Sequence, residues 1–101
     1  MTYNVRYKVP LPIAMYDGMH QVIKDIPGGS TGLLVHLGWE TAEGFEIIEV
    51  WESKEAVESF NKTVWPTVVQ KLGAGEMPPP RGEEFELRGL VLPANSTLIY
   101  S

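Results

Sequence analysis

Two consecutive apolar segments joined by a short polar turn constrain the fold of this chain most strongly. The segments Gly32–Trp39 and Phe45–Trp51 are rich in branched and aromatic residues. The stretch ETAEG between them predicts a hairpin, with Gly44 available for positive φ. Both strands are apolar on both sides, since Leu34, Ile48 and Val50 lie opposite the bulkier residues. A sheet built around this hairpin has two apolar faces, and each needs cover.

The rest of the chain supplies the elements that flank the hairpin. Tyr3–Val9 alternates in the period of a strand, and apolar residues recur at helical spacing from Ile13 to Ile26. Ser53 is an N-cap for a second helix that Gly73 ends and Pro66 kinks or restarts. Glu84–Leu92 alternates again, as a fourth strand. The order β-α-β-β-α-β predicts one α+β domain over residues 1–101, a ferredoxin-like four-stranded antiparallel sheet with both helices on one face.

Two helices on one face leave the second apolar face of the sheet in water. A second copy of the chain packing sheet to sheet is the simplest cover, and such closed assemblies are usually symmetric dimers. We therefore expect a homodimer. The tail 94–101 is too short for an element of its own, and its Leu98, Ile99 and Tyr100 would find cover on the partner protomer.

Composition excludes several classes of function. The chain has 8 basic and 13 acidic residues and no Cys. No basic stripe is available for nucleic acid, and thiolate metal sites and thiol nucleophiles are excluded. No segment is long and apolar enough for a membrane span or a leader peptide, so we expect a cytoplasmic protein. His20 and His36 lack metal-ligand spacing and a third ligand, so we expect no metal and no other cofactor.

The sequence resembles the dimeric α/β-barrel superfamily, and most of all its small bacterial uncharacterised members, related to the antibiotic-biosynthesis-monooxygenase-like group. The resemblance rests on three stretches: Tyr16-Asp17, Gly32–His36 and Glu49–Ser53, the last followed by Ala56 and Phe60. It implies a ferredoxin-like fold that closes into a barrel between protomers. It does not imply one activity, because the superfamily includes cofactor-free oxygenases, cyclases, isomerases and haem-degrading enzymes.

Haem degradation is the one activity that departures from the family pattern disfavour. Asn4 matches the first-strand Asn of the haem-degrading members. Their second-helix Trp and His, however, fall at Phe60 and Gln70 when the helix is aligned through Trp51 and Ser53. This chain then offers no axial His for haem.

Pairing the hairpin so that Trp39 faces Phe45 sorts the strand residues into two faces. Leu33, Val35, Leu37 and Trp39 would join Phe45, Ile47, Glu49 and Trp51 under the helices. The other face would gather Arg6, His36, Glu46 and Arg88 around an apolar floor, which suits a ligand pocket inside a barrel. Trp39 and Trp65 would line the pocket entrance or the dimer contact.

His36 is the first candidate for a catalytic general acid or base, because it titrates near neutrality and Arg6 or Glu46 could tune it. A histidine with only a structural hydrogen bond is the competing interpretation. Glu49 is a misfit on the helix side. Either it pairs with a Tyr hydroxyl or a Lys, or a bulge turns it into the cavity.

Two hypotheses about function follow. One is a metal-free homodimeric enzyme that acts on a hydrophobic or aromatic small molecule by proton transfer or cofactor-free oxygenation, with Arg6, Glu46, Arg88, Trp39 and Trp65 around the substrate. The other is a non-catalytic binding or accessory module that uses the same cleft. The residues alone do not choose between them.

Overall fold

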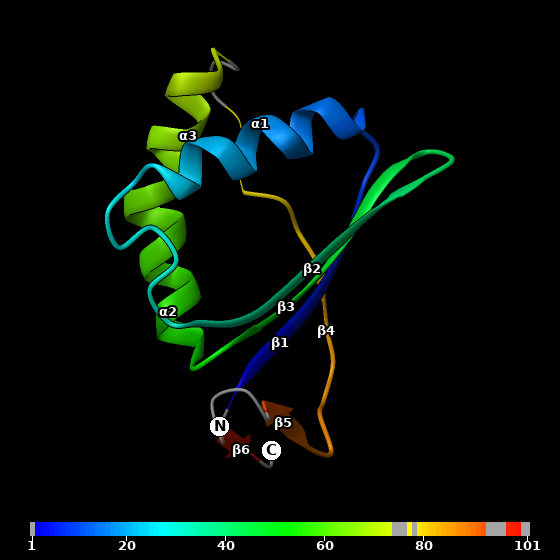
Figure 1. Ribbon diagram of the computed structural model, residues 1–101, viewed down its shortest axis with the longest axis vertical. Coiled ribbons are helices and arrows are strands. Elements are labelled where there is room, and N and C mark those ends of the chain that lie inside the picture. The colour runs from blue at the N-terminus through cyan, green and yellow to red at the C-terminus, as the bar shows by residue number, and fades with distance from the viewer. Residues whose placement is uncertain (1, 74–76, 78, 93–96, 100–101) are drawn as a thin grey trace.

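The computed structural model is an α+β domain with an open, four-stranded antiparallel sheet and two helical segments (Figure 1). It describes residues 2–73, 77, 79–92 and 97–99. In chain order the elements are β1 Tyr3–Val9, α1 Ile13–Lys24, β2 Leu33–Thr41, β3 Gly44–Trp51, α2 Lys54–Ser59, the π-helical η1 Phe60–Val64, α3 Trp65–Leu72, β4 Glu83–Glu84, β5 Leu90–Leu92 and β6 Thr97–Ile99. The sheet order is β2-β3-β1-β4, so β3 and β1 are the central strands.

Both helical segments lie on the same side of the sheet, with α1 crossing α3 (Figure 1). Their crossing is held by the buried side chains of Trp65, Val68 and Val69 on α3. Met19, Val22 and Ile23 of α1 pack against this cluster. The apolar stripes predicted for the two helices therefore meet each other as well as the sheet.

The second helical segment follows its sequence signals closely. The Ser53 side chain accepts a hydrogen bond from the amide of Ala56 at 3.2 Å, which confirms the predicted N-cap. The run α2-η1-α3 changes from α to π geometry at Phe60, and α3 restarts with Pro66 in its first turn. Gly73 ends the helix in the left-handed conformation, at φ 66°.

The hairpin is confirmed, but its predicted register is wrong. A two-residue turn, Ala42–Glu43, pairs Thr41 with Gly44, so Trp39 faces Glu46 and Glu40 faces Phe45. Along β2 there is also a bulge. Leu33 pairs with Trp51 and Val35 with Val50, which leaves Leu34 as an extra residue. Because side chains alternate along a strand, Val35, Leu37 and Trp39 turn away from the helices and His36 turns towards them.

The predicted faces of β1 and β3 are confirmed. β1 pairs antiparallel with β3 from Tyr3↔Trp51 to Val9↔Phe45. Val5, Phe45 and Trp51 are buried towards the helices, as the alternation indicated. Arg6, Glu46 and Ile48 lie on the outer face.

The C-terminal third differs from the prediction. Here β4, Glu83–Glu84, pairs with β1, and a backbone hydrogen bond from Phe85 N–H to Asn4 O continues this contact. The chain bends at Arg88, and Leu90–Leu92 pairs with Thr97–Ile99 in a separate two-stranded sheet. The single strand predicted over Glu84–Leu92 is therefore wrong, because the bend at Arg88 separates the residues that pair with β1 from those that pair with β6. The expectation that the tail forms no element is also wrong, because Thr97–Ile99 forms β6. Residues 93–96, 100 and 101 of the tail lie outside the described residues, so its packing on a partner stays a prediction.

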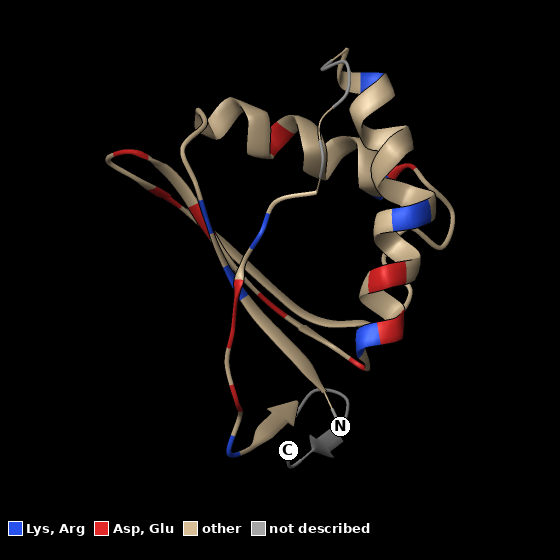
Figure 2. Cartoon of the chain, turned by 180° about the vertical axis from the view of Figure 1, so that it is seen from behind, with Lys and Arg blue, Asp and Glu red and all other residues tan. Residues whose placement is uncertain are grey.

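The outer face of the sheet carries exposed apolar side chains. Leu37 is 55% exposed and Trp39 39%. Charges of both signs lie among the strands, with Arg6 and Glu46 joined in an ion pair of 2.6 Å (Figure 2). In the part of the chain that the structure describes, no helix has the length and apolar character needed to cross a membrane.

Candidate functional site

A cavity of about 520 Å³ lies between the sheet and the helices. Its volume is in the range of small-molecule sites. The apolar lining comes from the inner face of the sheet, from both helical segments and from the loop before β4: Tyr7, Val9, Leu11, Met19, Ile23, Phe45, Ile47, Trp51, Val57, Phe60, Trp65, Met77, Pro79 and Pro80. The polar lining consists of Tyr16, His20, His36, Glu49, Asn61 and Arg81. The sequence predicts a pocket on the opposite face, between two sheets, whereas this cavity lies under the helices.

The register of the β2–β3 hairpin is what brings His36 to this cavity. The register predicted from the sequence places His36 on the outer face near Arg6 and Glu46. In the observed register, which the two-residue turn sets, His36 pairs with Glu49 of β3, on the face under the helices. The two residues that sequence reasoning left separate, a candidate base and an unexplained carboxylate, are therefore neighbours.

His36 and Glu49 form a hydrogen-bonded pair. The distance from His36 Nδ1 to Glu49 Oε2 is 2.8 Å, and each side chain keeps less than a fifth of its surface exposed. The indole N–H of Trp51 donates to the other oxygen, Oε1, at 3.1 Å. A carboxylate only accepts hydrogen bonds, so in this pair Nδ1 of His36 is the donor, and in a neutral ring Nε2 is then the acceptor.

Tyr16 of α1 meets that lone pair. Its hydroxyl lies 2.9 Å from His36 Nε2, so that it donates to the neutral ring. The ring reaches this position because it lies directly over Gly38 of β2. A Cβ on Gly38 would come within 2.5 Å of the Tyr16 hydroxyl oxygen. The series Tyr16–His36–Glu49 thus has the order of a hydroxyl, an imidazole and an orienting carboxylate.

His20, one turn after Tyr16 on α1, also approaches the Tyr16 hydroxyl. Its Nε2 is 3.4 Å from the Tyr16 oxygen, and its ring stacks on the Tyr16 ring with centroids 4.8 Å apart. The two imidazoles are also close, with centroids 4.8 Å apart. Residues four apart share one helix face, so Tyr16 and His20 reach the cavity together.

Burial perturbs several of these groups. Desolvation is the main cause that raises the pKa of Tyr16, and the charges of Asp17 and Glu49 raise it further. Desolvation also raises the pKa of Tyr7 strongly, helped by Glu49. The pKa of His20 is lowered by desolvation and then by His36, against opposing effects of Asp17 and Glu49. Perturbed groups that meet in a largely apolar cavity are typical of functional sites.

The chain matches no protein-family model and no curated protein. What the site can do is therefore argued from its geometry. A general base needs an oriented imidazole, a partner for the imidazolium that forms and a dry surrounding. His36, Glu49 and the apolar lining provide these three.

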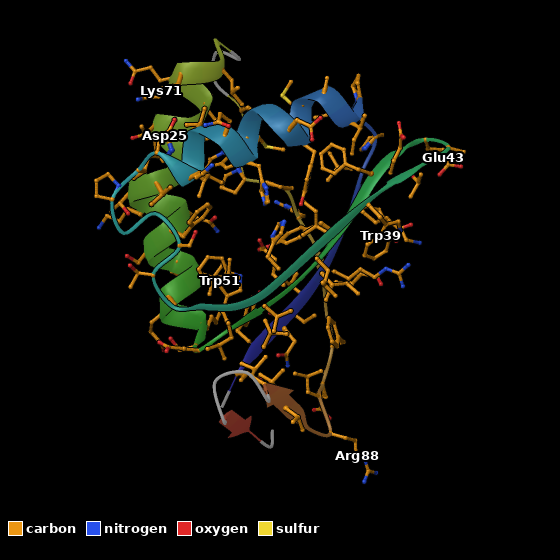
Figure 3. The ribbon with its side chains drawn as sticks, in the orientation of Figure 1. Asp25, Trp39, Glu43, Trp51, Lys71 and Arg88 are labelled. Atoms are coloured by element: carbon orange, nitrogen blue, oxygen red, sulfur yellow. The ribbon has the colours of Figure 1, made fainter. Side chains whose placement is uncertain are left out.

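Of the residues predicted to surround a ligand, the structure brings His36 and Trp65 to the cavity. Trp65 is buried, and its indole N–H donates to the backbone oxygen of Met77 at 2.8 Å, which fixes one wall. Figure 3 shows Trp51 between the sheet and the helices, Trp39 on the opposite side of the sheet and Arg88 at the far end from α1. Arg6 and Glu46 bind each other on the outer face through two hydrogen bonds, so they do not meet His36.

Sequence reasoning missed Tyr16 and His20 as site residues and left Glu49 open. The i, i+4 spacing of Tyr16 and His20 was a usable signal, because it places both on one helix face. The sequence marks Glu49 as a misfit and predicts that it pairs with a Tyr hydroxyl or a Lys, or that a bulge turns it into the cavity. Its observed partners are an imidazole and an indole instead.

The site is not arranged as a metal centre in the described part of the chain. There, no group of three or more His, Cys, Asp or Glu residues is placed to hold a metal ion. The cavity lining also includes the neutral amide of Asn61 and the cationic guanidinium of Arg81. Arg81 is exposed, which places it where the cavity meets solvent.

Proposed function

We propose that this protein is an enzyme that transfers protons on a hydrophobic, ring-containing small molecule held between the sheet and the helices. The observation that carries the proposal is His36, hydrogen-bonded to Glu49 at 2.8 Å and to Tyr16 at 2.9 Å in the wall of an apolar cavity. His36 is the general base, Glu49 orients and stabilises its protonated form, and Tyr16 presents the reacting hydroxyl.

In the proposed step the substrate gives up a proton to the Tyr16 oxygen while the Tyr16 hydroxyl proton passes to His36 Nε2. The product is an anionic substrate, stabilised as an enolate or phenolate, beside an imidazolium that Glu49 neutralises. The pKa of the Tyr16 hydroxyl is raised. Its oxygen is therefore a strong base once its own proton moves towards His36.

The proposal is tested with 2-tetralone, a neutral bicyclic ketone with acidic α-protons, by following α-proton exchange with D₂O by NMR. The wild-type protein should accelerate exchange over buffer alone. His36→Gln should lower the rate by about 10²-fold or more, the usual contribution of a positioned base. Glu58→Gln, which changes an exposed carboxylate on α2, should have the wild-type rate. Binding of 2-tetralone with exchange at the buffer rate would overturn catalysis and favour a non-catalytic binding module.

We also propose that the chain is a homodimer of ferredoxin-like protomers whose outer sheet faces pack together. The exposed side chains of Leu37 and Trp39 support this dimer, since removing a large apolar side chain from water is favourable in free energy. The same face presents Arg6 and Glu46, one charge of each sign. A two-fold axis brings a patch against itself, so a face with both signs is complementary to its own copy. The sheet order β2-β3-β1-β4 and the resemblance to dimeric α/β-barrel proteins point the same way.

A further inference from the structure

A proton that reaches His36 has few polar routes out of the cavity. On its Nδ1 side the ring meets Glu49, whose other oxygen is occupied by Trp51. On its Nε2 side it meets the Tyr16 hydroxyl. The rest of the cavity wall is mainly apolar, as described above. Turnover nevertheless requires that the proton taken from each substrate molecule be exchanged with water.

His20 connects the cavity to a second, open hollow on the outside of α1. That hollow is lined by Asp17, His20, Gln21, Ile23, Lys24 and Ser30. His20 and Ile23 line both spaces, and of these two only His20 can carry a proton. The residue is exposed, while its Nε2 lies 3.4 Å from the Tyr16 oxygen.

From this geometry we infer that His20 is a proton-relay residue, which passes protons between Tyr16 inside the cavity and water in the hollow outside α1. The inference rests on the proposed function, to which it adds the route of the proton. The Tyr16 oxygen lies between two imidazole Nε2 atoms, at 2.9 Å from His36 and 3.4 Å from His20. Its single hydroxyl proton can therefore be passed to either ring.

Each transfer along the route is balanced. The imidazolium of His36 returns its Nε2 proton to the Tyr16 oxygen, whose own proton passes to Nε2 of neutral His20. His20 then releases its Nδ1 proton to water, and a change of tautomer restores it. Burial and the neighbouring His36 lower the pKa of His20, which favours the neutral ring that can accept a proton. Asp17 and Glu49 oppose this effect, and Lys24 lines the outer hollow.

The first test is independent of any substrate: the rate at which the Tyr16 hydroxyl proton exchanges with water, measured by NMR saturation transfer. His20→Ala should slow this exchange on the order of tenfold, since the relay is missing. Added imidazole, which is small enough to occupy the vacated space, should restore it. Gln70→Ala, an exposed change on α3, should leave it unchanged. Equal exchange rates in wild type and His20→Ala would overturn the relay.

The second test separates the relay from the proposed function. In a low concentration of a bulky buffer, His20→Ala should lower the maximal rate of 2-tetralone exchange and leave KM unchanged. Imidazole should restore that rate in a saturable manner, which a structural defect would not allow. If the wild-type protein exchanges 2-tetralone and His20→Ala is equally fast in the bulky buffer, the relay is refuted and the proposed function is not. A wild-type protein without exchange would refute the proposed function, and the hydroxyl measurement would still decide the route.

Discussion

His36 and Glu49 are paired across the β2–β3 hairpin, with His36 Nδ1 2.8 Å from Glu49 Oε2. The two-residue turn Ala42–Glu43 produces this relationship, because it sets the register in which Thr41 pairs with Gly44 and His36 with Glu49. In the register predicted from the sequence, with Trp39 facing Phe45, His36 would lie on the outer face and Glu49 would have no titratable partner on β2. The turn thus links the local geometry of the hairpin to the chemistry of the cavity.

Replacing Glu49 by Gln should change the tautomer of His36 and slow proton transfer. The amide no longer fixes a proton on Nδ1 and cannot neutralise an imidazolium. We expect an Nδ1–H tautomer of His36 in the wild type and a mixture in Glu49→Gln, read from the ¹⁵N shifts of the ring. The maximal rate of 2-tetralone exchange should fall by about 10²-fold.

Trp51→Phe is the informative companion variant, since it removes the indole donor to Glu49 and keeps an aromatic core residue. It should shift the tautomer less than Glu49→Gln does. A wild-type His36 ring that is already an equal mixture of tautomers would contradict the assignment of Glu49 as the orienting group.

Replacing Gly38 by Ala should lower the rate of 2-tetralone exchange and change the free energy of unfolding only slightly. A Cβ at this position meets the hydroxyl end of the Tyr16 side chain, which can move aside. Gly38→Ala should therefore leave the free energy of unfolding within about 1 kcal/mol of the wild type, as Gly-to-Ala changes in regular structure do. Exchange of 2-tetralone should fall as far as in Tyr16→Phe, because both lose the hydroxyl at His36.

The double variant Gly38→Ala/Tyr16→Phe decides whether the glycine acts through the tyrosine. If it does, the double variant is no slower than Tyr16→Phe, since residues that act as one unit are not additive. Additive losses of rate would show that Gly38 acts by another route.

The fold could be predicted from the sequence where local patterns and long-range packing agree. The alternation of β1 and β3, the Ser53 cap and the Gly73 stop depend on neighbouring residues only, and they are confirmed. The register of β2 could not be predicted, because both of its faces are apolar and hydrophobicity does not distinguish them. The break in the C-terminal strand was missed because alternation continues across Gly89, while pairing depends on which partner strand is near.

The site was predictable in part for the same reason. His36 was found as a residue type, because a titratable side chain stands out on an apolar strand. Its neighbours could not be found, since a one-residue change in register replaces Arg6 and Glu46 by Tyr16 and Glu49. The volume between the helices and the sheet is also a tertiary property. The helical spacing of Phe60 indicates a core residue, yet it lines the cavity together with Trp65, which was predicted at a pocket entrance or dimer contact.

Tyr7 should make the protein less stable in alkali. Burial raises its pKa above the ordinary value of 10. The folded chain therefore keeps the phenol proton at a pH where the unfolded chain loses it. This contribution to stability is complete below about pH 10 and is lost as the pH rises through the higher folded pKa. Urea unfolding at several values between about pH 9 and pH 11 should show a falling free energy of unfolding. Tyr7→Phe should flatten the decline more than Tyr3→Phe does, and parallel curves for Tyr7→Phe and wild type would contradict this.

Leu37→Lys should separate the proposed dimer into monomers. Leu37 is 55% exposed on the outer sheet face, so burial of its remaining surface contributes at most about 1.5 kcal/mol per copy, roughly half of the value for a fully exposed side chain. A two-fold axis would place the new ammonium group against the partner's sheet and lose that contribution twice. The matched control is Val91→Lys, a similar change at a side chain that is 60% exposed on β5, outside the four-stranded sheet. We expect dimers of the wild type and of Val91→Lys at micromolar concentration by light scattering after size exclusion, and monomers of Leu37→Lys. A monomeric wild type would contradict the homodimer, whereas a dimeric Leu37→Lys would move the interface to another surface.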